Sequence, residues 1–341
     1  MSHHREFHDG RDDGLLPLES LDLDKVRTFP DLLRARSRTA FGGRALGEAF
    51  EVTLAMARDR DCKVVLTLSG AMTIAKMGRV ISAMIDHGLV HAIVSTGALM
   101  AHGLSEAVGL VHYRHDPSMS DEELFAKGYN RVYDTLEMEA NLNYVEEFTS
   151  RALDALSGQD LGSEIICRAL GKVLAEDGQS GVLRSAYDKG VPVYVPAFTD
   201  SELGLDLSTW AMRHAIATGA RREDAAFAVL PRYNPYLDLN SFARFCLGAD
   251  KLGIFTIGGG VPRNWAQEVG PYIDIMNHRL ELDLSPPRYQ YAVRICPEPT
   301  HWGGLSGCTY SEGVSWGKFV PPDEGGRFAP SAKRAKLLRS R

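Results

Sequence analysis

The 341-residue sequence has few cysteines, no long apolar run and no excess of basic charge. Its five cysteines are scattered and form no CxxC pair, so we expect reduced thiols rather than disulfides, and no structural zinc site. No stretch reaches the roughly 18 apolar residues of a membrane span, and the N-terminus lacks the apolar core of a signal peptide. The net charge of −6 disfavours a dedicated nucleic-acid-binding role. We therefore expect a cytoplasmic protein without membrane or nucleic-acid partners.

The sequence does contain a regular alternation of apolar, β-rich runs and amphipathic segments. The runs that resemble buried strands are 63–70, 91–97, 191–200, 251–260 and 291–295. The segments with a helical pattern are 44–59, 72–88, 163–177 and 239–251. Such alternation predicts an α/β fold with a mostly parallel sheet flanked by helices. No internal repeat or low-complexity linker divides the chain, so we expect a single large domain.

Small and polar residues follow several of the predicted strands, as LSG, STG, FTD and GGG. In open α/β sheets, ligands bind beyond the carboxyl ends of the strands. The candidate ligand-binding residues are Ser69, Gly70, Ser95, Thr96, Gly97, Asp200, Gly258, Gly259 and Gly260. Each of them alone is also explained by helix capping or by a tight turn, and the GGG turn lacks the GxGxxG pattern. Their joint occurrence at separate strand ends is better evidence than any single one.

Two histidine pairs have spacings that can supply metal ligands on a helix, namely His87 with His91 and His112 with His115. Gly88, however, ends the predicted helix between the members of the first pair. The second pair lies in the loop-like segment HYRHDPS, which has no acidic partners at matching spacing. We therefore predict no metal site.

Lys318 stands in the segment GVSWGKF, beside an aromatic residue and two glycines. Most lysines are simply solvated, and this reading needs no function. A lysine acts as a nucleophile when desolvation or a second cation disfavours its ammonium form. Trp316 could form an apolar wall or stack on a cationic substrate. The residues alone leave both roles open.

GVSWGKF resembles the active-site lysine motif of deoxyhypusine synthases, EAVSWGK. The segments FGGRALGEAF, IVSTGA, KGYNRVYD, VPVYVPAFTDSELG and IGGGV follow in the order and at the spacing of that family. The resemblance spans roughly residues 40–320, and GGGVPRNW and HWGGLSG bring it closer to the bacterial deoxyhypusine synthase-like proteins. It implies a Rossmann-like α/β fold, NAD as the cofactor, and a homotetramer with active sites at subunit interfaces.

The resemblance also implies a reaction. An aminobutyl group leaves a polyamine such as spermidine, is carried by the active-site lysine as an imine, and passes to an acceptor amine. The acceptor is a protein lysine in deoxyhypusine synthases and putrescine in the homospermidine synthases that arose from them. We expect a small diamine here, because residues near the substrate differ. A protein-lysine acceptor and an inactive polyamine- or NAD-binding homologue are the alternatives.

By position, the resemblance makes Lys318 the nucleophile. It assigns polyamine or substrate contacts to Glu312, Trp316, Asn264 and Asp206. Asp206 matches its family position only if one extra residue before it in this sequence is allowed for. It assigns cofactor contacts to Ser95, Thr96, Gly97, Asp200 and Gly258–Gly260. We expect Ser69 and Gly70, which follow another predicted strand, to line the same cofactor pocket. Three positions depart from the family. Asn264 replaces a catalytic histidine, His102 falls where an acid is usual, and Leu305 replaces another acid.

The departures continue at the C-terminus. The family continues after the lysine into a strand, an acidic turn that touches NAD, and a last helix. Here the basic segment SAKRAKLLRSR follows instead, which leads us to expect that a frameshift or truncation replaced the tail. The expected organisation is a partly disordered extension over 1–40, an NAD-binding domain over 41–325 and an atypical tail over 326–341.

Overall fold

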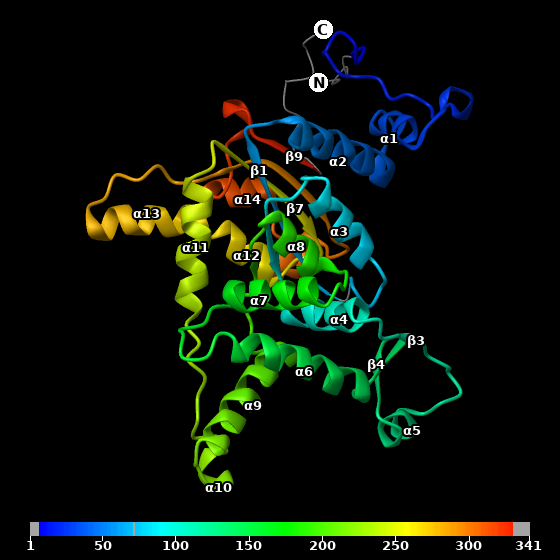
Figure 1. Ribbon diagram of the computed structural model, residues 1–341. Helices are drawn as coiled ribbons and strands as arrows, with labels where there is room; N and C mark the ends of the chain where they lie inside the picture. The colour runs from blue at the N-terminus through cyan, green and yellow to red at the C-terminus, as the bar shows by residue number, and fades with distance from the viewer. Residues whose placement is uncertain (1–6, 71, 330–341) are drawn as a thin grey trace, which may run out of the picture.

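A six-stranded parallel sheet forms the centre of the molecule in a computed structural model that describes residues 7–70 and 72–329 (Figure 1). Its strand order is β6-β2-β1-β7-β8-β9, and each neighbouring pair is parallel. The strands are β1 (Cys62–Leu68), β2 (Ala92–Ser95), β6 (Val193–Tyr194), β7 (Lys251–Ile257), β8 (Tyr289–Ile295) and β9 (Arg327–Ala329). The predicted Rossmann-like α/β fold with a mostly parallel sheet is confirmed.

Helices cover both faces of this sheet, because its central strands are apolar on both sides. In β1, Leu66 and Leu68 point into one apolar cluster and Val65 into the other. The first cluster is closed by α3 (Gly78–Asp86), α4 (Gly97–Ala107), α6 (Glu139–Asp154), α7 (Ser163–Glu176), α8 (Val182–Lys189) and α9 (Glu202–Ala217). The second is closed by α11 (Pro235–Leu247), α12 (Val261–Gln267), α13 (Val269–Leu280) and α14 (Tyr310–Ser315).

A small antiparallel sheet lies outside this core (Figure 1). Its order is β3-β5-β4, with β3 (Tyr113–Arg114), β4 (Tyr129–Val132) and β5 (Thr135–Met138), and α5 (Asp121–Ala126) precedes β4. Leu136 and Glu137 are the buried residues of its three strands. The small sheet therefore has little apolar surface to hold it against the rest of the molecule.

The N-terminal and C-terminal segments contribute to the main body. Helix α1 (Phe29–Ser37) packs on α2 (Phe41–Arg58), and a Cβ added at Gly47 would clash with the backbone of Ser37. The predicted boundary at residue 41 thus falls between two packed helices. Strand β9 pairs with β8 just inside the predicted tail, whose residues 330–341 lie outside the described residues.

The observed elements differ from the predicted ones mainly in length. The run 191–200 yields only two strand residues, because prolines 192 and 196 flank them and proline cannot donate to the ladder. The helix predicted over 72–88 is shortened to α3. The remaining short elements are η1 (Leu23–Lys25), α10 (Arg222–Ala225), η2 (Thr300–Trp302), η3 (Leu305–Gly307) and η4 (Pro322–Glu324). No helix in the described part of the chain has both the length and the apolarity needed to cross a membrane.

Candidate active site

Three of the predicted strand-end motifs meet at one edge of the main sheet. Leu68 of β1 is in register with Ser95 of β2 on one side and with Ile257 of β7 on the other. Ser69 and the glycine turn at 258–260 therefore lie side by side, and the Ser69 Oγ accepts a hydrogen bond of 2.7 Å from the Gly259 N–H. Parallel pairing of β2, β1 and β7 thus brings together residues that are about 190 positions apart in the sequence.

The glycine turn has one tightly packed side and one open side. Gly258 and Gly260 have φ angles of 84° and 69°, in the left-handed region that favours glycine. A Cβ at Gly258 would clash with Ser69, and one at Gly259 with Ser306. A Cβ at Gly260 or at Gly70 would meet no atom within 4 Å. The turn therefore presents bare backbone on its open side.

Two arginines hold the 305–308 segment against this turn. The buried Arg263 guanidinium donates to the carbonyl oxygens of Leu305 and Cys308, both at 2.9 Å. Arg294 donates to the Cys308 carbonyl at 2.6 Å as well. In residues 7–70 and 72–329, the side-chain hydrogen bonds of both arginines go to backbone carbonyl oxygens, not to carboxylates. Burial and the nearby Arg294 lower the pKa of Arg263, and the two positive charges stay close to the glycine turn.

The residues of the STG motif also stabilise the local structure. The buried Ser95 donates from its hydroxyl to the Thr96 carbonyl at 3.2 Å, and the Thr96 Oγ1 caps α4 by accepting from the Leu99 N–H. A Cβ at Gly97 would clash with Ser201 at the start of α9. Asp200, which precedes that serine, is exposed.

Lys318 is buried, as its predicted role requires, and its amine has two partners. The Nζ donates to the Glu268 Oε1 at 2.7 Å and to the Asn264 Oδ1 at 3.1 Å. It also lies 5.7 Å from the centre of the Trp316 ring, a distance suited to a cation–π contact. Asn264 is one helical turn beyond Gly260, so α12 places Lys318 close to the glycine turn.

The two predicted polyamine contacts beside Lys318 are exposed. Trp316 has 63% of its surface exposed and forms only one side of the lysine's surroundings. Glu312 caps α14, because the Thr309 Oγ1 accepts from the Glu312 N–H at 3.2 Å and the Glu312 Oε2 accepts from the Thr309 N–H at 3.4 Å. The motif around Lys318 therefore combines a helix cap with an open aromatic face.

Asp206 lies on the opposite face of the sheet from Lys318. It belongs to α9, whose Leu203 and Leu207 pack in the first apolar cluster, whereas Phe319 beside the lysine packs in the second. Burial, together with the charge of Glu146, raises the pKa of Asp206 to about 6. Within one chain, the structure does not bring Asp206 to Lys318.

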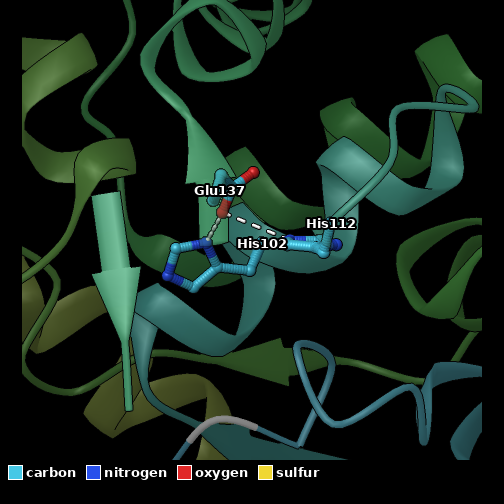
Figure 2. Close-up of side chains that lie close together, drawn as sticks. All are labelled: His102, His112 and Glu137. Atoms are coloured by element: carbon cyan, nitrogen blue, oxygen red, sulfur yellow. Dashed lines mark hydrogen bonds and ion pairs between the residues drawn. The ribbon is translucent and has the colours of Figure 1, made fainter. Parts of the chain in front are cut away.

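A second polar cluster, which the sequence analysis missed, surrounds Glu137 of β5 (Figure 2). His102 Nδ1 hydrogen-bonds to the Glu137 Oε2, and His112 Nε2 lies 3.3 Å from the same oxygen. Burial alone would raise the pKa of Glu137, but His102, His112 and the Ser105 hydroxyl outweigh it and bring this pKa to about 2. Burial likewise opposes charge on His102, yet Glu137 raises its pKa above the ordinary value.

Sequence spacing could not have found this cluster. The acidic partner of His112 comes from a strand 25 positions later, not from its own loop as the sequence analysis required. In the predicted pairs, the His91 Nδ1 accepts from the Val64 N–H at 3.0 Å, and His87 caps the end of α3. Glu268 was also missed, although its position four residues after Asn264 places both on one helical face.

Comparison with known proteins agrees with the family resemblance of the sequence motifs. The sequence matches the family described as deoxyhypusine synthase over residues 31–327. It is 34% identical over 306 residues to "Probable deoxyhypusine synthase 2" of Methanosarcina acetivorans, covering 87% of this chain and 81% of that protein. It is 30% identical over 325 residues to the deoxyhypusine synthase-like protein of Chlorobaculum parvum, covering 94% and 88%. The fold is similar to a structure described as "a putative deoxyhypusine synthase from Entamoeba histolytica", with a TM-score of 0.53, 14% identity, and coverage of 92% of this chain and 100% of that one.

Proposed function

The chain belongs to the deoxyhypusine synthase family, and from this premise we propose that it is an NAD-dependent transferase of aminobutyl groups from a polyamine such as spermidine. The observation that carries the proposal is the position of Lys318. Its amine is buried between Glu268 and Asn264 and faces an exposed Trp316, and Asn264 itself lies one helical turn beyond the glycine turn at the strand ends. A nucleophilic lysine beside a candidate cofactor-binding edge suits this reaction.

The nucleophilic step depends on the partners of Lys318. Bound NAD supplies an acceptor for the hydride that leaves the polyamine carbon beside the secondary amine. The Lys318 nitrogen then attacks the resulting imine carbon, the bond from this carbon to the departing diaminopropane nitrogen breaks, and Lys318 carries the aminobutyl group as an imine. The lysine must first lose a proton, and Glu268 at 2.7 Å is the carboxylate in reach.

The strand-end residues fit the NAD that this reaction needs. The open backbone at Gly70 and Gly260 allows close approach of a pyrophosphate, and the nearby arginines 263 and 294 favour its negative charge. We propose that the cofactor is held by Ser69, Gly70, Ser95, Thr96, Gly97, Asp200 and Gly258–Gly260. The exposed carboxylate of Asp200 is suited to accept a hydrogen bond from a ribose hydroxyl.

The position of the acidic residues supports an active site shared between subunits. A polyamine carries several ammonium groups, and carboxylates are their natural partners. Glu312 stands near Lys318, but Asp206 lies on the other face of the sheet. One substrate can contact both only if a second chain contributes one of them. We therefore propose a homotetramer with active sites at its interfaces.

Borohydride trapping tests the proposed chemistry most directly. The protein is incubated with spermidine and NAD and reduced, and its peptides are analysed by mass spectrometry. We expect an aminobutyl group fixed on Lys318, and no adduct when NAD is omitted. A protein that binds both compounds but shows no adduct at Lys318 would instead be the inactive binding homologue.

The acceptor is a separate question, and we propose a small diamine such as putrescine. Asn264, His102 and Leu305 replace residues that the resemblance places near the substrate, so the acceptor is held differently here. Incubation with NAD, spermidine and putrescine should yield homospermidine and diaminopropane. If diaminopropane forms only when a translation-factor protein is added, and its lysine gains mass, the acceptor is a protein lysine.

A further inference from the structure

Three side chains from separate elements converge between α4 and the small sheet (Figure 2). His102 comes from the middle of α4, His112 from the segment before β3, and Glu137 from β5. One ligand atom from each lies within 4.8 Å of the other two. The side chains of His112 and Glu137 are 1% exposed, and that of His102 is 13% exposed.

A second observation points to a ligand at the same place. Ser105 Oγ, His112 Nε2 and Glu137 Oε1 are all buried and form no hydrogen bond of good geometry, although Ser105 and His112 lie close enough to Glu137 to lower its pKa. Buried polar atoms are nearly always paired in proteins, so three unpaired atoms in one cluster need an explanation. The His112 Nε2 is only 3.3 Å from the Glu137 Oε2, yet it is not aligned for a hydrogen bond. An ion bound between these atoms would satisfy them.

We propose that His102, His112 and Glu137 bind a divalent transition-metal ion of the zinc class. The ligand atoms are His102 Nδ1, His112 Nε2 and a Glu137 carboxylate oxygen, with a fourth position left for water or the Ser105 hydroxyl. Two imidazoles and one carboxylate suit zinc and its neighbours, whereas magnesium and calcium prefer oxygen ligands alone. Tetrahedral bonds of about 2.1 Å place ligand atoms about 3.4 Å apart, so only small side-chain shifts are needed.

The ion would anchor the small sheet. Its strands bury only Leu136 and Glu137, so few apolar contacts hold β5 against α4. A metal joined to one ligand on α4, one on the following segment and one on β5 would link these three elements. Within one chain, the proposed ion and Lys318 lie on opposite faces of the main sheet, so the ion is not a partner of that chain's own lysine.

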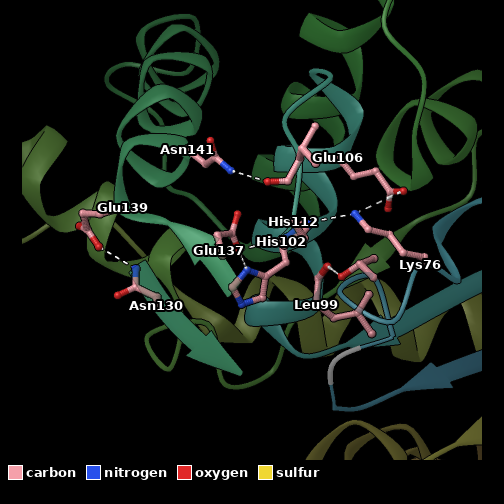
Figure 3. A network of polar contacts seen from close by, with 11 residues as sticks. Lys76, Leu99, His102, Glu106, His112, Asn130, Glu137, Glu139 and Asn141 are labelled. Carbon is pink, nitrogen blue, oxygen red and sulfur yellow. Dashed lines mark hydrogen bonds and ion pairs between the residues drawn. The ribbon is translucent and has the colours of Figure 1, made fainter. Parts of the chain in front are cut away.

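Lys76 competes with the metal (Figure 3). Its Nζ lies 2.7 Å from the His112 Nδ1 and 3.8 Å from the Glu106 Oε1. An ammonium group only donates, so in this arrangement the His112 Nδ1 accepts and its proton sits on Nε2. Metal binding at Nε2 moves that proton to Nδ1, and Lys76 must then turn towards Glu106. Removing the lysine charge should therefore strengthen metal binding.

Titration of the full chain with Zn²⁺ tests the site. His3 and His4 are changed to Gln in every arm, so that they cannot bind the probe, and the protein is first dialysed against a chelator. We expect one Zn²⁺ per chain by calorimetry and a higher melting temperature on binding. Co²⁺ should give the strong visible absorption of a tetrahedral site rather than the weak absorption of a hydrated ion.

Variants locate the ion. His112→Gln and Glu137→Gln should each weaken Zn²⁺ binding by about 100-fold, since outer-shell changes alone cost 10- to 100-fold. His87→Gln, at an exposed position outside the cluster, is the matched control and should bind as the parent does. Lys76→Met should bind about tenfold more tightly, because the competing ammonium is gone.

Either of two outcomes overturns the proposal. One is the absence of stoichiometric Zn²⁺ binding, which would make the cluster a hydrogen-bonded network only. The other is equal binding by the parent and the His112→Gln protein. If His112→Gln does not fold, the Co²⁺ spectra of the parent and of Lys76→Met decide, and a weak, hydrated-type spectrum in both overturns the proposal.

Discussion

Lys318 and His102 each donate to a glutamate, but the two pairs differ in their access to solvent. Glu268, the partner of Lys318, has 42% of its side chain exposed, whereas Glu137, the partner of His102, has 1%. An ion pair that solvent reaches is weak, so its lysine can leave the carboxylate and react with a substrate. A buried pair is costly to break and therefore holds a structure or an ion in place. Similar ion pairs thus suit different tasks, and burial decides which.

The largest effect should come from Lys318→Arg, which preserves a charge beside Glu268 but removes the nucleophile. Arginine stays protonated in proteins and cannot form the imine. Diaminopropane release from spermidine and NAD should fall by at least about 10³-fold. Thermal unfolding of the variant checks that its fold is retained. An active, folded Lys318→Arg protein would rule out the lysine mechanism.

The contrast in burial predicts unequal costs for two equivalent substitutions. Glu137→Gln should lower the free energy of unfolding by about 3 kcal/mol, because it leaves His102 without its buried counter-charge. Glu268→Gln should lower it by less than about 1 kcal/mol, since that pair is partly solvated. Urea unfolding in the presence of a chelator measures both. Similar values for the two variants would show that solvent access does not set the strength of these two ion pairs.

Glu268→Gln should instead affect the chemistry. Without a proton acceptor in reach of Lys318, formation of the trapped adduct should slow by about 10²-fold at neutral pH. The loss should shrink at high pH, where free hydroxide can remove the proton, and a purely structural role would not give this dependence. Asp86→Asn, at an exposed carboxylate on α3, whose apolar residues pack in the first cluster, is the matched control and should react at the parent rate.

The smallest effect should come from a substitution at Asp206. Its carboxyl group is partly buried, and the positive charge of Arg213 does not offset the effect of burial. Its pKa in the folded state is about 6, against an ordinary value of 3.8, so the folded state holds the proton more tightly. The free energy of unfolding therefore falls as pH rises through this window. Asp206→Asn should be about 2 kcal/mol more stable than the parent at pH 8 and equal to it at pH 4.

Urea unfolding of both proteins at the two pH values checks this prediction. Spermidine should reduce the difference at pH 8 if its ammonium groups pair with Asp206. No change in the difference would argue against Asp206 as a polyamine contact.

The strands were the most predictable part of the fold, because their signal is local. Apolar runs at 63–70 and 251–260 correspond to β1 and β7, each buried on both faces. The run at 191–200 predicted a longer strand than the structure has, since its two prolines restrict the strand to the two residues of β6. The small sheet gave no comparable signal, because its strands are short and mostly solvated. A strand of this kind is defined by the strands it pairs with and not by apolar residues of its own, so local composition cannot reveal it.

By itself, the sequence determined the alternating α/β order, the glycine turn and the lysine of GVSWGKF, since these depend on neighbouring residues and on φ angles that favour glycine. Only the tertiary structure decided which charges meet. Glu268, which caps the end of α12, meets Lys318, and β5 brings Glu137 to His102 and His112. The reason is physical: an ion pair or a ligand set depends on distances in space, and packing sets those distances between residues that the sequence keeps far apart.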